Sequence, residues 1–177
     1  MTDLWTYEAE ARAAGFSLIC GVDEAGAGPL MGPVYAAAVI LPENCDLPGL
    51  NDSKKLTEKK REALFPLIQE QALAWSVASV SAREIDDTDI LSARMKAMQL
   101  AIDGLSQKPD LALIDGNRDR GRCAAILTPH RCIISGDSLS ASIAAASVLA
   151  KVSRDRYVTD VLDKEYPQYR FAQHKGY

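Results

Sequence analysis

Four acidic side chains stand at or beside the ends of short apolar runs, where parallel strands of an α/β sheet place ligand-binding groups. They are Asp23, Glu24, Asp115 and Asp137. Their chain positions allow the carboxylates to converge on one cluster, and such a cluster needs a cation. Oxygen donors without histidine favour the hard ions Mg²⁺ or Mn²⁺ over zinc. Two ions roughly 4 Å apart would activate water and stabilise a leaving oxygen, the chemistry of a two-metal hydrolase.

The segment 21–34 combines Asp23 and Glu24 with three following glycines and two prolines. Glycines permit positive φ and let a bulky ligand approach backbone N–H groups, so acids beside glycines indicate a metal and a phosphate at one place. That combination suits phosphodiester cleavage. The plainer interpretation is a glycine-rich turn with two solvated acids.

Apolar periodicity along the rest of the chain predicts an α/β fold with a mixed central sheet flanked by helices. Residues 16–22 and 33–41 are expected to pair as a hairpin with both acids near its rim. Thr57 can cap a helix that Pro66 kinks or breaks. Further strands are expected over 72–80, 110–116 and 131–137, and helices over 57–70, 90–105 and 138–163.

Length and composition indicate one domain spanning residues 1–177, with 47% hydrophobic and 25% charged residues. No apolar run approaches the ~18 residues of a membrane span, and the acidic start is unlike a signal peptide, so we expect a cytoplasmic protein with no membrane partner. The four cysteines lack Cys-x-x-Cys spacing and only two histidines are present. Free thiols are therefore expected instead of disulfides or a structural zinc.

The net charge of −4 argues weakly against nucleic acid, but the distribution of charge matters more than its sum. Basic residues gather at Lys54-Lys55, at 59–61 and at 118–122. For any one cluster alone a solvated face is the simpler interpretation, and the arginines at 118, 120 and 122 are expected to decorate an exposed loop.

From about Gly15 to its last residue the chain resembles bacterial ribonuclease HII. Several separate motifs carry the resemblance in the same order: VDEAGAGPLMGPV at 22–34, NDSKKL at 51–56, IDG at 114–116, GDS at 136–138, IAAASVLAKVSRD at 143–155 and HKGY at 174–177. The resemblance implies the ribonuclease H-like fold and dependence on Mg²⁺ or Mn²⁺, with two ions when substrate is bound. It also implies a monomer that cuts RNA within RNA–DNA hybrids and at ribonucleotides embedded in duplex DNA, leaving 5′-phosphate and 3′-hydroxyl ends.

Residue roles follow from the same resemblance. The family's metal-binding and catalytic acids correspond to Asp23, Glu24, Asp115 and Asp137, with Asp23 shared between two ions and Glu24 acting partly through its backbone. The segment that senses the ribose 2′-hydroxyl corresponds to Gly26, Ala27 and Gly28. Backbone-phosphate contacts correspond to Ser53, Lys54 and Lys55, and the junction tyrosine corresponds to Tyr177.

Two departures from the family pattern keep other functions open. Ala27 stands where the family has arginine, so a cation is missing beside the scissile region. The chain also ends at Tyr177, where the family continues into a further C-terminal segment. One alternative is a hybrid-binding protein with impaired or lost turnover, and another is a different two-metal nuclease such as a junction resolvase.

Overall fold

The computed structural model describes residues 4–26, 32–43 and 45–162, and within them five strands form one mixed sheet. The strands lie in the order β3-β2-β1-β4-β5 and comprise Ile19–Ala25 (β1), Val34–Ile40 (β2), Ala74–Val80 (β3), Leu111–Asp115 (β4) and His130–Ile133 (β5). The pairs β1–β2 and β2–β3 are antiparallel, whereas β1–β4 and β4–β5 are parallel. The predicted mixed sheet is confirmed.

The predicted hairpin is formed by β1 and β2, paired from Cys20 opposite Ile40 to Ala25 opposite Tyr35. Both strands are rich in buried apolar and small residues because helices cover both faces of the sheet. Both acids lie near the end of this ladder, as predicted: Asp23 is opposite Ala37 and Glu24 is opposite Ala36, and one further pair follows them.

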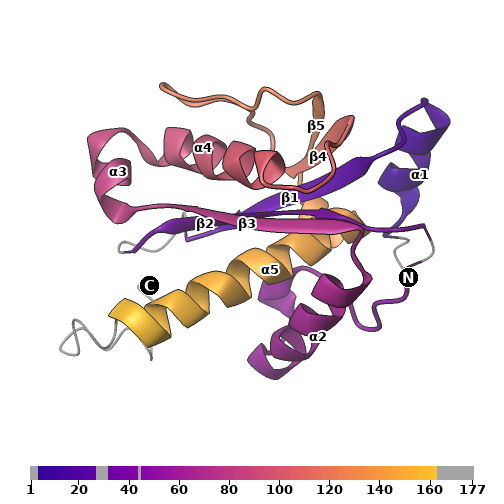
Figure 1. The fold of residues 1–177 in the computed structure, drawn as a ribbon, viewed down its shortest axis with the longest axis horizontal. Helices are drawn as coiled ribbons and strands as arrows, with labels where there is room; N and C mark the ends of the chain where they lie inside the picture. Colours follow the sequence, from indigo (N-terminus) through magenta and orange to yellow (C-terminus); the bar gives the residue numbers. More distant parts are fainter. Residues whose placement is uncertain (1–3, 27–31, 44, 163–177) are drawn as a thin grey trace.

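Figure 1 shows the sheet between two helical layers. On one face lies α4 (Ile90–Asp103), and on the other lie α2 (Glu58–Gln71) and α5 (Ala141–Tyr157). The α4 face buries alternate residues of β1 and β4 against Met95 and Met98 of α4. The α5 face buries Ala37 and Val39 of β2 against Leu64 and Ile68 of α2.

Helix α5 lies unusually close to β1. A Cβ atom added at Gly21 would lie 2.1 Å from the carbonyl carbon of Ser142, so only glycine admits this approach. The small residues Ala144–Ala146 of α5 are all buried. This close contact fixes the N-terminus of α5 against Gly21, which is two residues before Asp23.

Other elements differ from the sequence expectation. The predicted break at Pro66 is absent: α2 is continuous, because Pro66 is on the exposed side, where the carbonyl it leaves unpaired can meet water. Two short helices, α1 (Thr6–Ala13) and α3 (Ala82–Asp87), were not predicted. The strand expected over 131–137 ends at Ile133, and Asp137 instead lies in a short 3₁₀ turn, η2 (Gly136–Ser138). Among the helices described, none has the length and apolarity of a membrane span.

Candidate active site

The register of the parallel strands brings Asp23 and Asp115 side by side. The β1–β4 ladder ends with Val22 opposite Ile114, so each aspartate is the next residue of its strand. Side chains alternate between the two faces of a strand, and both aspartates share the face covered by α5. The sequence predicted that these two aspartates would converge with Glu24 and Asp137, from their places at three expected strand ends.

Asp137 reaches the same place from the turn before α5. Ser140 caps that helix by accepting a hydrogen bond from the Ile143 N–H, and the buried Glu8 of α1 accepts from the Ser140 hydroxyl at 2.7 Å. Gly136 leaves room for the turn, because a Cβ atom there would lie 2.6 Å from Ile143 Cδ1. The Asp137 N–H then donates to Asp115 Oδ1 at 3.2 Å.

The resulting cluster holds three carboxylates that are largely buried. One oxygen from each of Asp23, Asp115 and Asp137 lies within 4.8 Å of the others. Asp23 is only 5% exposed and Asp137 only 7%. Three negative charges this close repel one another strongly unless a cation or protons are shared among them.

The pKa values of the carboxyl groups reflect that repulsion. Burial, followed by the charges of Asp115 and Glu24, raises the pKa of Asp23 well above its ordinary value. Burial, followed by the charges of Asp115 and Asp52, raises the pKa of Asp137 to about 6. Divalent cations would replace the shared protons, and a site made only of carboxylate oxygens suits hard ions. The cluster therefore fits the Mg²⁺ or Mn²⁺ expected from the sequence.

Glu24 is oriented differently from the other three acids. As the next residue of β1 after Asp23, its side chain lies on the α4 face of the sheet, where its Oε1 forms an ion pair with Arg94 Nε at 3.1 Å. Burial still raises the pKa of Glu24, while Arg94 opposes that shift. The Glu24 side chain thus lies on the other face of the sheet from the three aspartates and pairs with Arg94, although its charge still helps to raise the pKa of Asp23.

The turn η1 (Ser53–Lys55) places a lysine beside the cluster. Asp52 caps this turn by accepting from the Lys54 N–H, and the Ser53 N–H donates to Ser147 Oγ of α5. Burial alone would lower the pKa of Lys54, but the carboxylates of Asp52, Asp137, Asp23 and Glu24 together raise it. Lys54 is therefore held as a cation among these acids. Ser53 is 5% exposed, so its side chain faces the protein interior.

An open cleft adjoins the same turn. It encloses about 570 Å³ and is lined by Lys55 and Ser138 among others: Leu4, Gly49, Leu50, Asn51 and Leu139. Lys55 is exposed there and Ser138 follows Asp137 directly.

Two members of the site were missed from the sequence. Asp52 faces Asp137 from a loop, and Arg94 faces Glu24 from the middle of a helix. The only available signal for Asp52 was its position directly before Ser53, Lys54 and Lys55. That motif was interpreted as a phosphate contact because of its lysines. Arg94 carried no local signal, because its partner is 70 residues away in the chain.

The predicted 2′-hydroxyl sensor and junction residue fall mostly outside the described part of the chain. That holds for Ala27, Gly28 and Tyr177. Gly26 is described: its φ is +96°, and an added Cβ would lie 2.6 Å from the Pro33 carbonyl oxygen. The buried Arg154 of α5 donates from Nε to that same carbonyl at 3.2 Å. A glycine is thus required where the segment leaves β1.

Comparisons with known proteins agree with this architecture. The family model described as Ribonuclease HII matches residues 20–177. Ribonuclease HII of Vibrio vulnificus strain YJ016 is 56% identical over 163 residues, which is 92% of this chain and 76% of the relative. That of Shewanella baltica is 56% identical over 173 residues, 96% of this chain and 81% of the relative. The crystal structure of ribonuclease H2 from Pyrococcus horikoshii superposes with a TM-score of 0.72 at 28% identity, covering 85% of this chain and 77% of that one.

Proposed function

Because the chain belongs to the ribonuclease HII family, it is a ribonuclease H, and we propose that Asp23, Asp115 and Asp137 carry its activity by holding divalent metal ions. The enzyme is an endonuclease that hydrolyses the RNA of RNA–DNA hybrids. The observation that supports this role for the three aspartates is their convergence within 4.8 Å in a buried space with raised carboxyl pKa values.

The negative charges of the three carboxylates are the reason to expect that the enzyme requires a divalent metal. Mg²⁺ or Mn²⁺ held by these carboxylates would activate the attacking water and stabilise the leaving oxygen. Asp23, at the centre of the repulsion and nearly fully buried, is the proposed ligand common to two ions. Asp115 and Asp137 hold the cluster's geometry through the hydrogen bond between them.

The remaining residues bind and orient the substrate. Lys54, held as a cation beside the acids, is positioned to contact a backbone phosphate, and Lys55 extends that contact along the cleft. Glu24 is proposed to act through its backbone, since its carboxylate is engaged by Arg94. The segment Gly26, Ala27, Gly28 is proposed to meet the ribose 2′-hydroxyl, the group that distinguishes RNA from DNA.

Substrates are proposed to include single ribonucleotides embedded in duplex DNA, with Tyr177 at the ribonucleotide–deoxynucleotide junction. Water attacks phosphorus and the bond to the 3′ oxygen breaks, which yields 5′-phosphate and 3′-hydroxyl ends. A monomer located in the cytoplasm remains the expectation from the sequence. The alternative of a hybrid-binding protein without turnover finds no support among these relatives.

Cleavage of a duplex that contains one ribonucleotide tests the proposal. We expect cutting with Mg²⁺ or Mn²⁺, none with excess chelator, and none by Asp23→Asn. Activity that survives chelation or Asp23→Asn would remove the metal-binding role. An Ala27→Arg variant measured in parallel restores the family's cation, and we expect a lower KM for the duplex with a similar metal dependence.

A further inference from the structure

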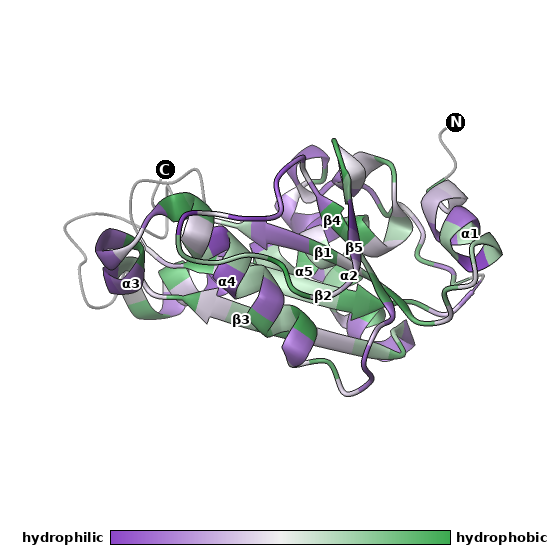
Figure 2. Ribbon diagram, turned by 90° about the horizontal axis from the view of Figure 1, so that it is seen from above, coloured by the Kyte–Doolittle hydropathy of each residue, from purple (hydrophilic) through white to green (hydrophobic). Residues whose placement is uncertain are grey.

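The segment between β4 and β5, residues 116–129, forms an arm that crosses over α4 (Figures 1 and 2). We call it the arginine arm, because Arg118, Arg120 and Arg122 are three of five consecutive residues and all are exposed. The arm begins directly after Asp115, a member of the acidic cluster. Nothing in the proposed chemistry uses these three cations.

The arm is held rigidly by its own backbone and by α4. Asp119 accepts a hydrogen bond from the Ile126 N–H at 2.7 Å, Arg120 forms a bridge with Ala125, and Ile126 is buried in the core. The Cys123 N–H donates to Ser92 Oγ at 2.8 Å. A surface that is already ordered loses little conformational entropy when it binds a ligand.

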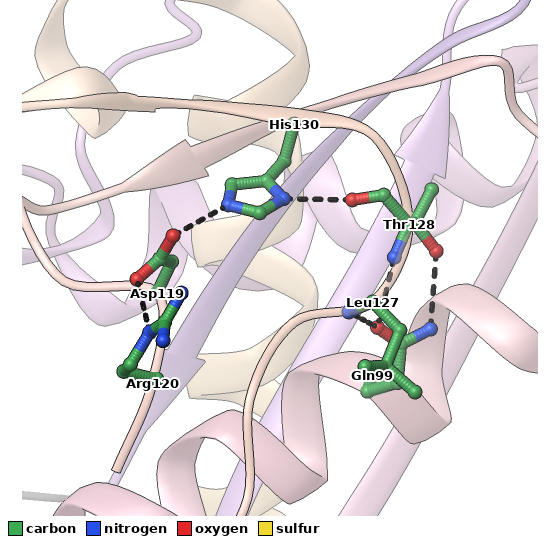
Figure 3. A network of polar contacts seen from close by, with 6 residues as sticks. All are labelled: Gln99, Asp119, Arg120, Leu127, Thr128 and His130. Carbon is green, nitrogen blue, oxygen red and sulfur yellow. Dashed lines mark hydrogen bonds and ion pairs between the residues drawn. The ribbon is translucent and has the colours of Figure 1, made fainter.

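A polar network fixes the base of the arm, as Figure 3 shows. Gln99 of α4 accepts from the Leu127 N–H at 2.7 Å and donates to the Thr128 hydroxyl at 3.1 Å. His130 of β5 contacts the Thr128 carbonyl oxygen through Nδ1 at 2.7 Å and Asp119 Oδ2 through Nε2 at 3.0 Å. Both halves of the arm are thus tied to the sheet.

The arginine side chains remain available to a ligand. Within the described part of the chain, neither Arg118 nor Arg122 forms a salt bridge. Arg120 has a long contact of 3.6 Å with Asp119, and its side chain is 78% exposed. Such an exposed pair contributes little, so a phosphate can take the place of the carboxylate.

The arm and Lys54 lie on opposite sides of the sheet whose strands carry Asp23 and Asp115. Lys54 belongs to a turn anchored on α5, whereas the arm is anchored on α4, across the sheet. Arg118 is three positions after Asp115 in the chain, so their Cα atoms are at most about 11 Å apart. A duplex carries a phosphate every ~3.4 Å of axis on each strand, so Arg118 is within a few nucleotides of Asp115.

We propose that the arginine arm is a second nucleic-acid contact, which binds backbone phosphates of the duplex while Lys54 binds on the other side of the cut. This inference rests on the proposed function for its ligand. It explains how a chain with net charge −4 and a buried acidic cluster attracts a polyanion: cations on two preorganised segments offset the repulsion locally.

The test is the affinity for a labelled RNA–DNA hybrid, measured by fluorescence anisotropy in excess chelator over a series of salt concentrations. The variant Arg118→Ala/Arg120→Ala/Arg122→Ala should lower the slope of log K against log salt by about 0.9 for each phosphate lost, which is about eightfold in Kd per phosphate at 0.1 M salt. The three Arg→Lys substitutions should retain most of the slope. With Mg²⁺, kcat at saturating hybrid should be unchanged.

The matched control removes three positive charges outside the arm, as Arg12→Ala/Lys108→Ala/Arg131→Ala. An arm variant whose Kd and slope equal those of this control would overturn the proposal, as would lysine substitutions that behave like alanine. If the triple variant is unfolded by circular dichroism, Arg118→Ala alone decides, with the same eightfold expectation. Because binding is measured in chelator, the arm is tested even if the wild-type protein does not cut the hybrid.

Discussion

The two ends of β4 carry aspartates in opposite surroundings. At its start, the Asp110 carboxylate accepts hydrogen bonds from the Ser17 and Leu18 N–H groups at 2.8 and 2.9 Å. At its end, Asp115 faces Asp23 and Asp137 across less than 4.8 Å. A carboxylate with its own donors stabilises the fold, whereas carboxylates that face each other in a buried space favour the binding of a cation. The difference separates a structural acid from a candidate catalytic one.

The largest predicted effect comes from neutralising one aspartate at each end. Asp115→Asn should lower kcat for hybrid cleavage by about 10³-fold or more, because several kcal/mol of metal-dependent stabilisation is lost. Asp110→Asn should change kcat by no more than about twofold and lower Tm by about 2–4 °C, because two backbone donors lose a charged acceptor. Steady-state cleavage and thermal melting measure both. Equal losses of activity in the two variants would erase the distinction between the ends.

Two lysine variants test the same comparison between the two ends of the sheet, and we expect their effects on KM to be smaller than the effect of Asp115→Asn on kcat. Lys54→Met should raise KM for the hybrid about ten- to hundredfold, because one charge-assisted phosphate contact is lost. Lys108→Met, an exposed lysine at the amino end of the sheet, should leave KM within about twofold. KM values at one fixed salt concentration decide this. A Lys54→Met variant with wild-type KM would show that this lysine serves only to offset the acids.

A pH dependence should appear at the acidic end alone. In the metal-free protein the pKa of Asp137 is about 6 and that of Asp23 is also raised, so the folded state binds extra protons. Stability therefore falls as the pH rises from the unfolded pKa of about 4 through the folded values. Metal binds the ionised carboxylates, so the rise in Tm caused by saturating Mg²⁺ should grow as the pH increases through about 6.

Thermal melts with and without Mg²⁺ at about pH 5 and about pH 7.5 test that expectation. Asp110→Asn should show the same pH response as the wild-type protein. An equal Mg²⁺-induced shift at both pH values would mean that the titrating carboxyls do not bind the ion.

The sequence predicted the parts of this molecule that depend on local pattern. Apolar runs predicted the five strands, and the acids at predicted strand ends were expected to meet. Asp23, Asp115 and Asp137 do meet, although Asp137 comes from a 3₁₀ turn and not from a strand end. The parallel register that makes Asp23 and Asp115 neighbours follows from the fold class, since ligand-binding groups collect at one edge of such a sheet.

Long-range contacts could not be predicted in the same way. Glu24 was grouped with the other acids because it adjoins Asp23, but strand alternation turns its side chain toward Arg94 of α4. Asp52 joins the site only because its turn is anchored on α5. The arginines of the arm were expected to lie on a simple exposed loop. The contacts that order the arm could not be predicted, because they come from Ser92, Gln99 and His130, which are distant from the arginines or follow them in the chain.

The most direct test of the metal-binding role is the melting temperature of Asp23→Asn with and without Mg²⁺. Without metal, the variant should be more stable than the wild-type protein, because one buried and mutually repelled carboxylate is gone. With Mg²⁺ at a hundredfold excess over Kd, the wild-type Tm should rise by about 5–10 °C and the variant's Tm should not. A less stable metal-free variant that keeps the full Mg²⁺ response would contradict the assignment of this cluster as the metal site.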